Sequence, residues 1–430
     1  MKKKYFLNGN ILDPHNSIEE MGGLIISEDG KIEAIGKKVN KNNIPSREKF
    51  VDLKEKHVFP GIVDMRVFVG EPGFEYKENF KTLSNAALSG GVTSVVSMPN
   101  TSPVIDNVSM VDFLKRRGRD KAKINIYPAA SLTKNIEGKK MTEFGLLKRK
   151  GVIAFTDGLK TVQNPQVMSR IMNYAGESGA LIMQHAEDNI LSAGGLINEG
   201  EISTRLGLKG IPALAEKIIV ERDLSFLEEY NCRYHISQIS SGKTLSTIKR
   251  AKEEGKIFST GVSINNLSLN ENDIGDFKTF LKLSPPLRTE QDRLSLINAI
   301  GEGLIEVIVS DHKPEDEESK RLTFAQAATG ATGIETLLPL ALELFHNNSL
   351  KLNKIIASIT SNPAKILGID KGSLQIGRDA DLCVVDINKP WVVNKDKLLS
   401  KSKNTPIEDR KLQGQIIKTF IKGEIAFERA

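Results

Sequence analysis

The chain has 430 residues, of which 39% are hydrophobic and 27% are charged, so its composition is that of a globular protein and excludes disorder and collagen-like repeats. Its net charge of +6 comes from interspersed basic and acidic residues, and no basic stripe interleaved with aromatic residues predicts nucleic-acid binding. The two cysteines have neither metal-binding nor redox spacing, and no apolar run is long enough for a membrane helix. We therefore expect a cytoplasmic protein with no nucleic-acid or membrane partner.

Short runs of β-branched and aromatic residues at both ends of the chain predict strands. The first 58 residues contain several such runs, and residues 374–430 repeat the pattern. Turn signals at 8–10 and 28–30 separate the first runs, so we expect a small antiparallel β module at the start of the chain.

The middle of the chain alternates short apolar runs with longer amphipathic segments. The runs predict buried parallel strands at 92–98, 124–127, 151–155, 180–183 and 304–309. The amphipathic segments predict helices at 80–88, 164–178 and 245–254. This alternation is typical of a parallel sheet with helical crossovers, and a barrel is favoured because no Gly-x-Gly-x-x-Gly pattern follows the early strands.

Active sites of such barrels lie at the carboxyl ends of the strands, so the polar residues after each run are the candidates for function. These segments are 64–73, 97–101, 155–158, 183–188, 234–241 and 309–314.

Together with further motifs at 283–288, 332–340, 361–368, 377–382 and 399–406, these segments resemble the long bacterial dihydroorotases of the amidohydrolase superfamily. The resemblance implies an α/β fold with a (β/α)8 barrel at 59–373. It also implies a composite β-sandwich built from 1–58 and 374–430. Members of this family use a divalent metal, usually zinc, to generate hydroxide and to polarise a cyclic amide in pyrimidine synthesis.

Three positions match metal-site residues of the family. Asp157 matches a bridging carboxylate, His185 a histidine ligand, and Asp311 the metal-ligating general acid or base. Each residue also has an ordinary alternative role. His185 could be a core histidine, Asp157 a turn residue and Asp311 a helix cap.

The other metal ligands implied by the resemblance are replaced. Arg66 and Phe68 stand where the family has a His-x-His pair, and Gln238 stands where it has a further histidine. A guanidinium does not deprotonate to bind a cation, and a phenyl ring has no donor atom. His235 lies three residues before Gln238, so in a regular strand it faces the opposite way and does not substitute. We therefore expect zinc at one weakened site, or no metal.

A buried carboxylate without a countercharge is costly. We therefore expect the Arg66 guanidinium to pair with Asp157, Asp311 or both.

The substrate-binding positions implied by the resemblance are also altered. Asn100 is retained, and Gly330 keeps the glycine of a Phe-Gly pair. An expected arginine is Gly70, an expected asparagine is Ser284, and an expected histidine is Glu315, whose carboxylate would repel an anionic substrate.

Two functions follow from these expectations. The first is a catalytically defective dihydroorotase-like protein that acts as a structural partner of aspartate carbamoyltransferase, as some members of the family do. The alternative is an active dihydroorotase or related cyclic amidohydrolase. A binding protein for a small ligand is a third possibility, and a homo-oligomer is an open alternative.

Overall fold

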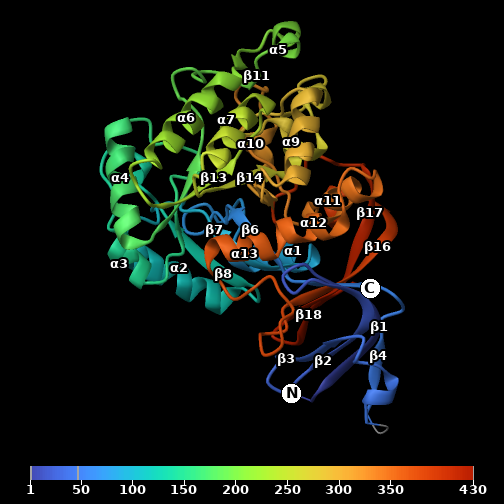
Figure 1. Cartoon of the computed structure of the whole chain (residues 1–430). Helices are drawn as coiled ribbons and strands as arrows, with labels where there is room; N and C mark the ends of the chain where they lie inside the picture. Colours follow the sequence, from blue (N-terminus) through green and yellow to red (C-terminus); the bar gives the residue numbers. More distant parts are fainter. Residues whose placement is uncertain (1, 46–47, 430) are drawn as a thin grey trace.

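The computed structural model describes residues 2–45 and 48–429. Figure 1 shows two parts: a helix-surrounded barrel built from the middle of the chain, and a β-domain in which the blue and red ends of the chain lie together. The first barrel strand begins at Ile62, directly after a β-domain strand that ends at Pro60, so the barrel starts next to the β-domain.

The barrel sheet runs in the order β15-β14-β13-β10-β9-β8-β7-β6, with every neighbouring pair parallel. Its strands are β6 (Ile62–Val67), β7 (Val92–Ser97), β8 (Asn125–Ala130), β9 (Ala154–Phe155), β10 (Leu181–His185), β13 (Arg233–Gln238), β14 (Ser259–Ser263) and β15 (Val307–Val309). Val67 bridges His312 in parallel, which brings the first and last strands together. The predicted (β/α)8 barrel is therefore confirmed.

Helices connect these strands and cover the outside of the barrel (Figure 1). They are α1 (Phe80–Ser89), α2 (Val108–Lys121), α3 (Phe144–Arg149), α4 (Pro165–Ser178), α5 (Glu201–Leu206), α6 (Ala213–Phe226), α7 (Gly242–Glu253), α8 (Ile264–Ser268), α9 (Glu290–Glu302), α10 (Glu317–Lys320), α11 (Leu337–His346), α12 (Leu352–Ile359) and α13 (Ser361–Leu367). The three predicted helices are confirmed within a few residues. In the described part of the chain, none of the helices has the length and apolar character needed to cross a bilayer.

The β-domain is composite, as expected. Its sheet runs β18-β17-β16-β5-β1-β2-β3, with β4 beside β1. The strands are β1 (Lys4–Asp13), β2 (Ile18–Ile26), β3 (Ile32–Gly36), β4 (Phe50–Asp52), β5 (His57–Pro60), β16 (Leu382–Val392), β17 (Lys411–Ile421) and β18 (Glu424–Glu428). Strand β5 joins the two ends of the chain, because it pairs with β1 on one side and with β16 on the other.

Two details of the first segment differ from the prediction. The signal at 8–10 is not a turn, because β1 continues through it with a register shift between Phe6 and Gly9 and a left-handed Asn8 (φ 57°). Asparagine and glycine favour both bulges and turns because they readily adopt a backbone with positive φ. The module is also not purely antiparallel, since β4 and β5 both run parallel to β1. The signal at 28–30 does mark the turn between β2 and β3.

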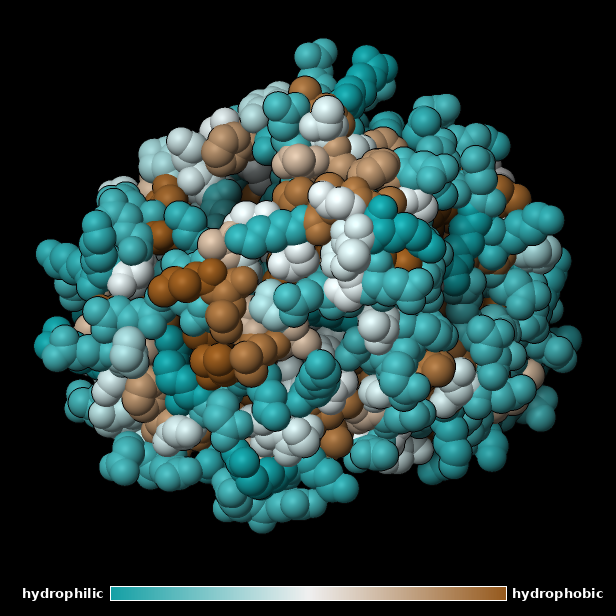
Figure 2. All heavy atoms as spheres, turned by 90° about the horizontal axis from the view of Figure 1, so that it is seen from above, coloured by the Kyte–Doolittle hydropathy of each residue, from teal (hydrophilic) through white to brown (hydrophobic). Residues whose placement is uncertain are grey.

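Figure 2 shows the molecule from above, relative to the view of Figure 1. Hydrophilic side chains cover most of this view, and a group of hydrophobic ones lies left of its centre. A short two-stranded sheet, β11 (Ile197–Asn198) with β12 (Gly210–Ile211), lies with α5 at the far end of the barrel from the β-domain (Figure 1).

Replacement of Phe420 by alanine is expected to destabilise the β-domain, because this fully buried ring packs edge-on against Phe6 at 5.4 Å and so joins the two ends of the chain. A loss of about 3–5 kcal/mol in the free energy of unfolding is expected, measured by urea denaturation. Ile425→Ala on neighbouring β18 is the matched control, since its side chain is 47% exposed and should change stability by about 0.5 kcal/mol or less. Equal effects of the two substitutions would contradict this role of Phe420.

Candidate functional site at the barrel centre

The residues singled out in the sequence gather at the carboxyl ends of the barrel strands. Arg66 lies on β6, His185 ends β10 and Gln238 ends β13, while Asp157 and Asp311 each follow their strands by two residues. All five side chains are buried. The parallel barrel explains this convergence, because it brings the ends of strands distant in sequence to one face.

Arg66 forms the central ion pair of this site. Its Nε donates to Asp311 Oδ1 at 3.0 Å, and both Nη atoms lie 3.3 Å from the Gly158 carbonyl oxygen. The guanidinium lies 5.3 Å from the centre of the Phe68 ring, within range of a cation–π contact. The arginine side chain is completely excluded from solvent. The predicted pairing of Arg66 with a retained carboxylate is therefore confirmed for Asp311.

The surroundings of Asp311 act on its carboxyl group in opposite directions. Burial raises its pKa, and the positive charge of Arg66 offsets part of that rise. The Gln238 amide also lowers the pKa of Asp311, although in the described part of the chain its nitrogen and oxygen have no hydrogen-bond partner of normal geometry. The positive charge that stabilises the ionised form of Asp311 therefore comes mainly from the Arg66 side chain.

Asp157 does not pair with Arg66. Its two carboxylate oxygens accept from the Thr133 amide at 3.0 Å and from the Thr133 hydroxyl at 2.6 Å. Burial raises the pKa of Asp157 to about 6, and the bonds from Thr133 oppose this rise. Thr133 lies in the loop after β8, where no sequence signal pointed to it. Of the two carboxylates expected as partners, Arg66 therefore pairs with Asp311 and not with Asp157, because the threonine already satisfies the Asp157 carboxylate.

Two histidines lie inside the barrel. Among the described residues, neither ring nitrogen of His185 has a hydrogen-bond partner. Burial, together with the charge of Arg66, lowers the pKa of His185 to about 3. The same two causes lower the pKa of His235 to about 3, and its Nδ1 lies 2.8 Å from Ser259 Oγ. Both imidazoles are therefore neutral at physiological pH.

The orientation of His235 differs from the prediction. Met183 pairs with His235 and His185 pairs with Gln238, with a register shift between the two pairs. One extra residue in β13 therefore changes the alternation, so that His235 and Gln238 face the same side as Met183 and His185. A bulge of this kind depends on the neighbouring strand, which the alternation pattern of a single strand does not reveal.

The residues at the barrel centre do not fit a catalytic zinc ion. Such a site needs three nitrogen, oxygen or sulfur ligands close together and an open position. Within residues 2–45 and 48–429, no three histidine, cysteine, aspartate or glutamate side chains form a group that could hold a metal ion. The buried cation of Arg66 and the engagement of Asp157 by Thr133 explain why the retained residues do not form a metal cage.

The retained Asn100 contacts the chain rather than an open cavity. Its Nδ2 donates to the Asp157 carbonyl at 3.2 Å, and its side chain packs against Gly158. A Cβ atom at position 158 would lie 1.7 Å from Asn100 Oδ1, and φ is +68° there. Glycine is therefore favoured at this position, since a side chain would be strained and would displace Asn100, and Asn100 helps to hold the loop whose carbonyl accepts from Arg66.

Gly330 has a similar structural position. Its backbone amide donates to the Lys282 carbonyl at 2.9 Å, and its carbonyl accepts from Asn404 Nδ2 at 3.0 Å. A role of Gly330 in substrate binding stays a prediction.

The replaced substrate positions also have partners within the chain. Gly70 has φ of +75°, and a Cβ there would lie 2.8 Å from the Phe74 carbonyl oxygen, so this backbone does not accommodate an arginine. Glu315 is buried between Lys77 and Lys313, whose Nζ atoms lie 2.6 and 2.5 Å from its carboxylate. The expected repulsion of an anion by Glu315 is thus counteracted by two lysines, which sequence reasoning missed.

The barrel and the composite β-domain together define the fold class of this chain, and solved structures share it. The L-hydantoinase (dihydropyrimidinase) of Arthrobacter aurescens shares this fold with a TM-score of 0.88 and 22% identity, over 100% of this chain and 96% of that one. A dihydropyrimidinase from Brevibacillus agri NCHU1002 shares the fold with a TM-score of 0.82 and 21% identity. The match covers 99% of this chain and 95% of that one.

Sequence comparison identifies the family to which the chain belongs. Residues 55–244 match the family model described as "Dihydro-orotase-like". A dihydroorotase of Syntrophus aciditrophicus is 39% identical over 420 residues, covering 98% of each chain. One of a Wolbachia from Brugia malayi is 39% identical over 429 residues, covering 99% of this chain and 96% of the other. This chain belongs to the dihydroorotase family.

Replacement of Arg66 by methionine is expected to lower the free energy of unfolding by about 3–5 kcal/mol at neutral pH, because it leaves Asp311 buried without its cation. Burial already raises the pKa of Asp311, so this carboxyl favours the folded state when protonated and loses that contribution as the pH rises. The defect of the variant should therefore shrink as the pH falls and the Asp311 carboxyl takes up a proton, as followed by denaturant unfolding at several pH values.

The matched control is the double variant Arg66→Met/Asp311→Asn, since asparagine carries no charge and tolerates the left-handed backbone of position 311 (φ 51°). It should recover most of the stability lost by Arg66→Met. Wild-type stability of Arg66→Met at every pH would disprove the role of the ion pair.

Proposed function

We propose that this chain is a dihydroorotase-family protein of pyrimidine biosynthesis whose barrel no longer hydrolyses dihydroorotate, and that it serves as a structural partner of aspartate carbamoyltransferase. We place it in the cytoplasm on the same grounds of family resemblance.

The main support for the proposed loss of activity is one observation: the fully buried Arg66 guanidinium pairs with Asp311 at 3.0 Å. In the family that the sequence resembles, this position belongs to a metal-binding histidine, and Asp311 corresponds to the residue that handles the proton. An arginine stays protonated, so it occupies Asp311 at every physiological pH and repels a cation placed beside it.

The altered substrate positions support the same proposal. A dihydroorotate carboxylate would lack the arginine expected at position 70, where the backbone conformation favours glycine. The histidine expected at position 315 is a glutamate, whose carboxylate is paired with Lys77 and Lys313 within the chain.

The structural role is supported by what the chain retains. The barrel and the β-domain keep the architecture of their structural relatives, while Arg66, Phe68 and Gln238 stand where the family has metal-binding histidines. A scaffold needs its shape and surface and not its catalytic groups.

The alternative is an active dihydroorotase or related cyclic amidohydrolase. The names of the full-length relatives at 36–39% identity favour it. In that case the retained Asp311 would have to act without the family's histidine set.

Dihydroorotase turnover and zinc content of the same purified sample separate these functions. We expect less than one zinc per chain after incubation with zinc, and no turnover above that of an Asp311→Asn variant. Turnover that is present in the natural chain and absent from Asp311→Asn would refute the loss of activity.

Restoring the family's ligands tests the reason for the loss. The triple variant R66H/F68H/Q238H is expected to bind about one zinc or more per chain, because it removes the buried cation and adds three imidazole donors around His185 and Asp311. Metal analysis measures the gain, and F68H alone, which keeps Arg66, is the control. Equal zinc binding by the natural chain and the triple variant would show that Arg66 does not exclude metal.

The structural role has its own test. The chain is mixed at micromolar concentration with the aspartate carbamoyltransferase of its own organism and analysed by size-exclusion chromatography. A co-eluting complex is expected, and separate elution would contradict the partnership without bearing on the loss of activity.

A further inference from the structure

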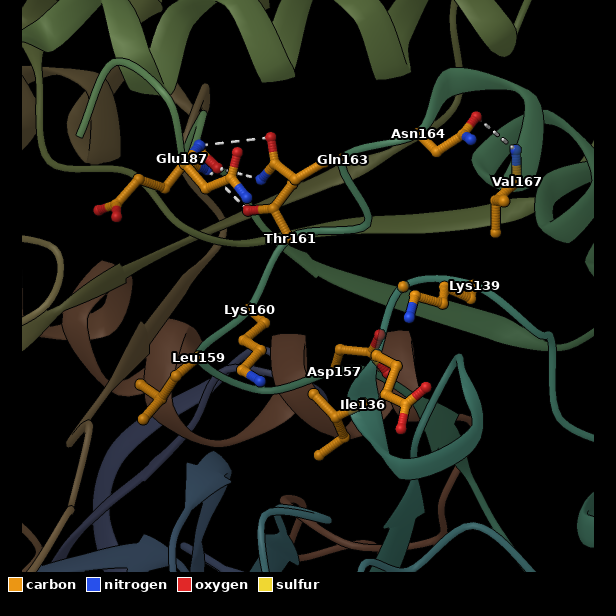
Figure 3. Close-up of a pocket in the computed structure, with 13 residues that line it drawn as sticks. Ile136, Lys139, Asp157, Leu159, Lys160, Thr161, Gln163, Asn164, Val167 and Glu187 are labelled. Atoms are coloured by element: carbon orange, nitrogen blue, oxygen red, sulfur yellow. Dashed lines mark hydrogen bonds between the residues drawn. The ribbon is translucent and has the colours of Figure 1, made fainter. Parts of the chain in front are cut away.

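A cavity of about 770 Å³ lies at the mouth of the barrel, between the loops that follow β8, β9 and β10. Figure 3 shows its walls: the loop after β8 contributes Lys139, the loop after β9 contributes Lys160, and Glu187 follows β10 on the other side. This volume suits a small metabolite.

Two lysines supply positive charge to this cavity. Figure 3 shows the Lys139 and Lys160 side chains extending toward its middle from two different loops. Neither ammonium group is within 4 Å of a carboxylate oxygen in the described part of the chain, and both side chains are exposed. Their charges are therefore available to an incoming group, unlike those of Lys77 and Lys313, which pair with Glu315.

The acidic residues of the cavity do not cancel these charges by pairing. The Asp157 carboxylate is bound by Thr133, and Lys160 is close enough to lower its pKa against the larger effect of burial. Glu187 lies on the opposite wall, where burial raises the pKa of its carboxyl and so favours the uncharged form. Glu137 is exposed at the rim.

The remaining surface is suited to the rest of a small molecule. Ile136, Leu159 and Val167 contribute apolar side chains to the lining. Helix α4 begins at this cavity, with no acidic residue in its first turn, and its partial positive charge adds to that of the two lysines.

We propose that this cavity binds a small anionic metabolite whose carboxylate or phosphate group is held between Lys139 and Lys160, with its apolar part against Ile136, Leu159 and Val167. The site differs from the position where the family would place its arginine, which is Gly70 in this chain. It goes beyond the proposed function, because binding here requires neither hydrolysis nor a protein partner.

The test measures binding of two probes, inorganic phosphate and succinate, to the full chain by calorimetry and by thermal shift. At least one probe should bind, and the double variant Lys139→Gln/Lys160→Gln should lower the affinity for that probe about tenfold or more. Each lost contact between a lysine and the anion accounts for a large part of this change in affinity. Rising sodium chloride should weaken binding to the natural chain as well. The matched control is Lys140→Gln, which removes a neighbouring exposed lysine that does not line the cavity.

The pattern of results identifies the anion or rejects the site. Preference for phosphate indicates a phosphorylated ligand, and preference for succinate indicates a carboxylic acid. Equal binding by the natural chain and the double variant, an equal loss in Lys140→Gln, or no binding of either probe would overturn the proposal. Thermal unfolding of both variants without probe confirms that these exposed substitutions leave the fold intact.

Discussion

The Asp311 carboxylate is buried at the centre of the barrel, where an unpaired charge is costly, and its partner is the guanidinium of Arg66. Its contacts do more than neutralise Asp311. They connect β6 to the segment after β15 and to the Gly158 carbonyl after β9, beside the backbone bridge between Val67 and His312. One side chain therefore satisfies the buried charge and helps to close the barrel between its first and last strands.

The changes around this ion pair form a consistent set. Phe68 places an aromatic ring beside the guanidinium. Asp157 is hydrogen-bonded to Thr133, so Arg66 pairs with one carboxylate, that of Asp311. The neutral state of His185 agrees with the same charge, since a second cation in this buried space would be strongly disfavoured. The barrel centre thus resembles a closed ion-pair core more than a metal cage, while the open space of the barrel mouth lies to one side, next to Asp157.

Much of this arrangement could be predicted from sequence, because alternating apolar runs and helices define a barrel and place the residues after each strand on one face. A pairing of Arg66 with at least one of the two carboxylates could also be predicted, because an unpaired buried charge is costly, but the choice of Asp311 over Asp157 could not. The bulge that turns His235 inward could not be predicted, because it depends on the register with the adjacent strand. Thr133 was missed for a related reason: a loop threonine carries no signal of the carboxylate that it will bind.

The position of β5 between β1 and β16 has a consequence for synthesis of the protein. The sheet of the β-domain stays incomplete until the strands from β16 onward have left the ribosome, roughly 320 residues after β5. At ordinary elongation rates this delay is about 20–60 s, during which the apolar side chains of the first strands lack their final neighbours. The barrel segments emerge during this interval and can fold first, so the early strands need protection from wrong pairing in the cell while their partner is still being made.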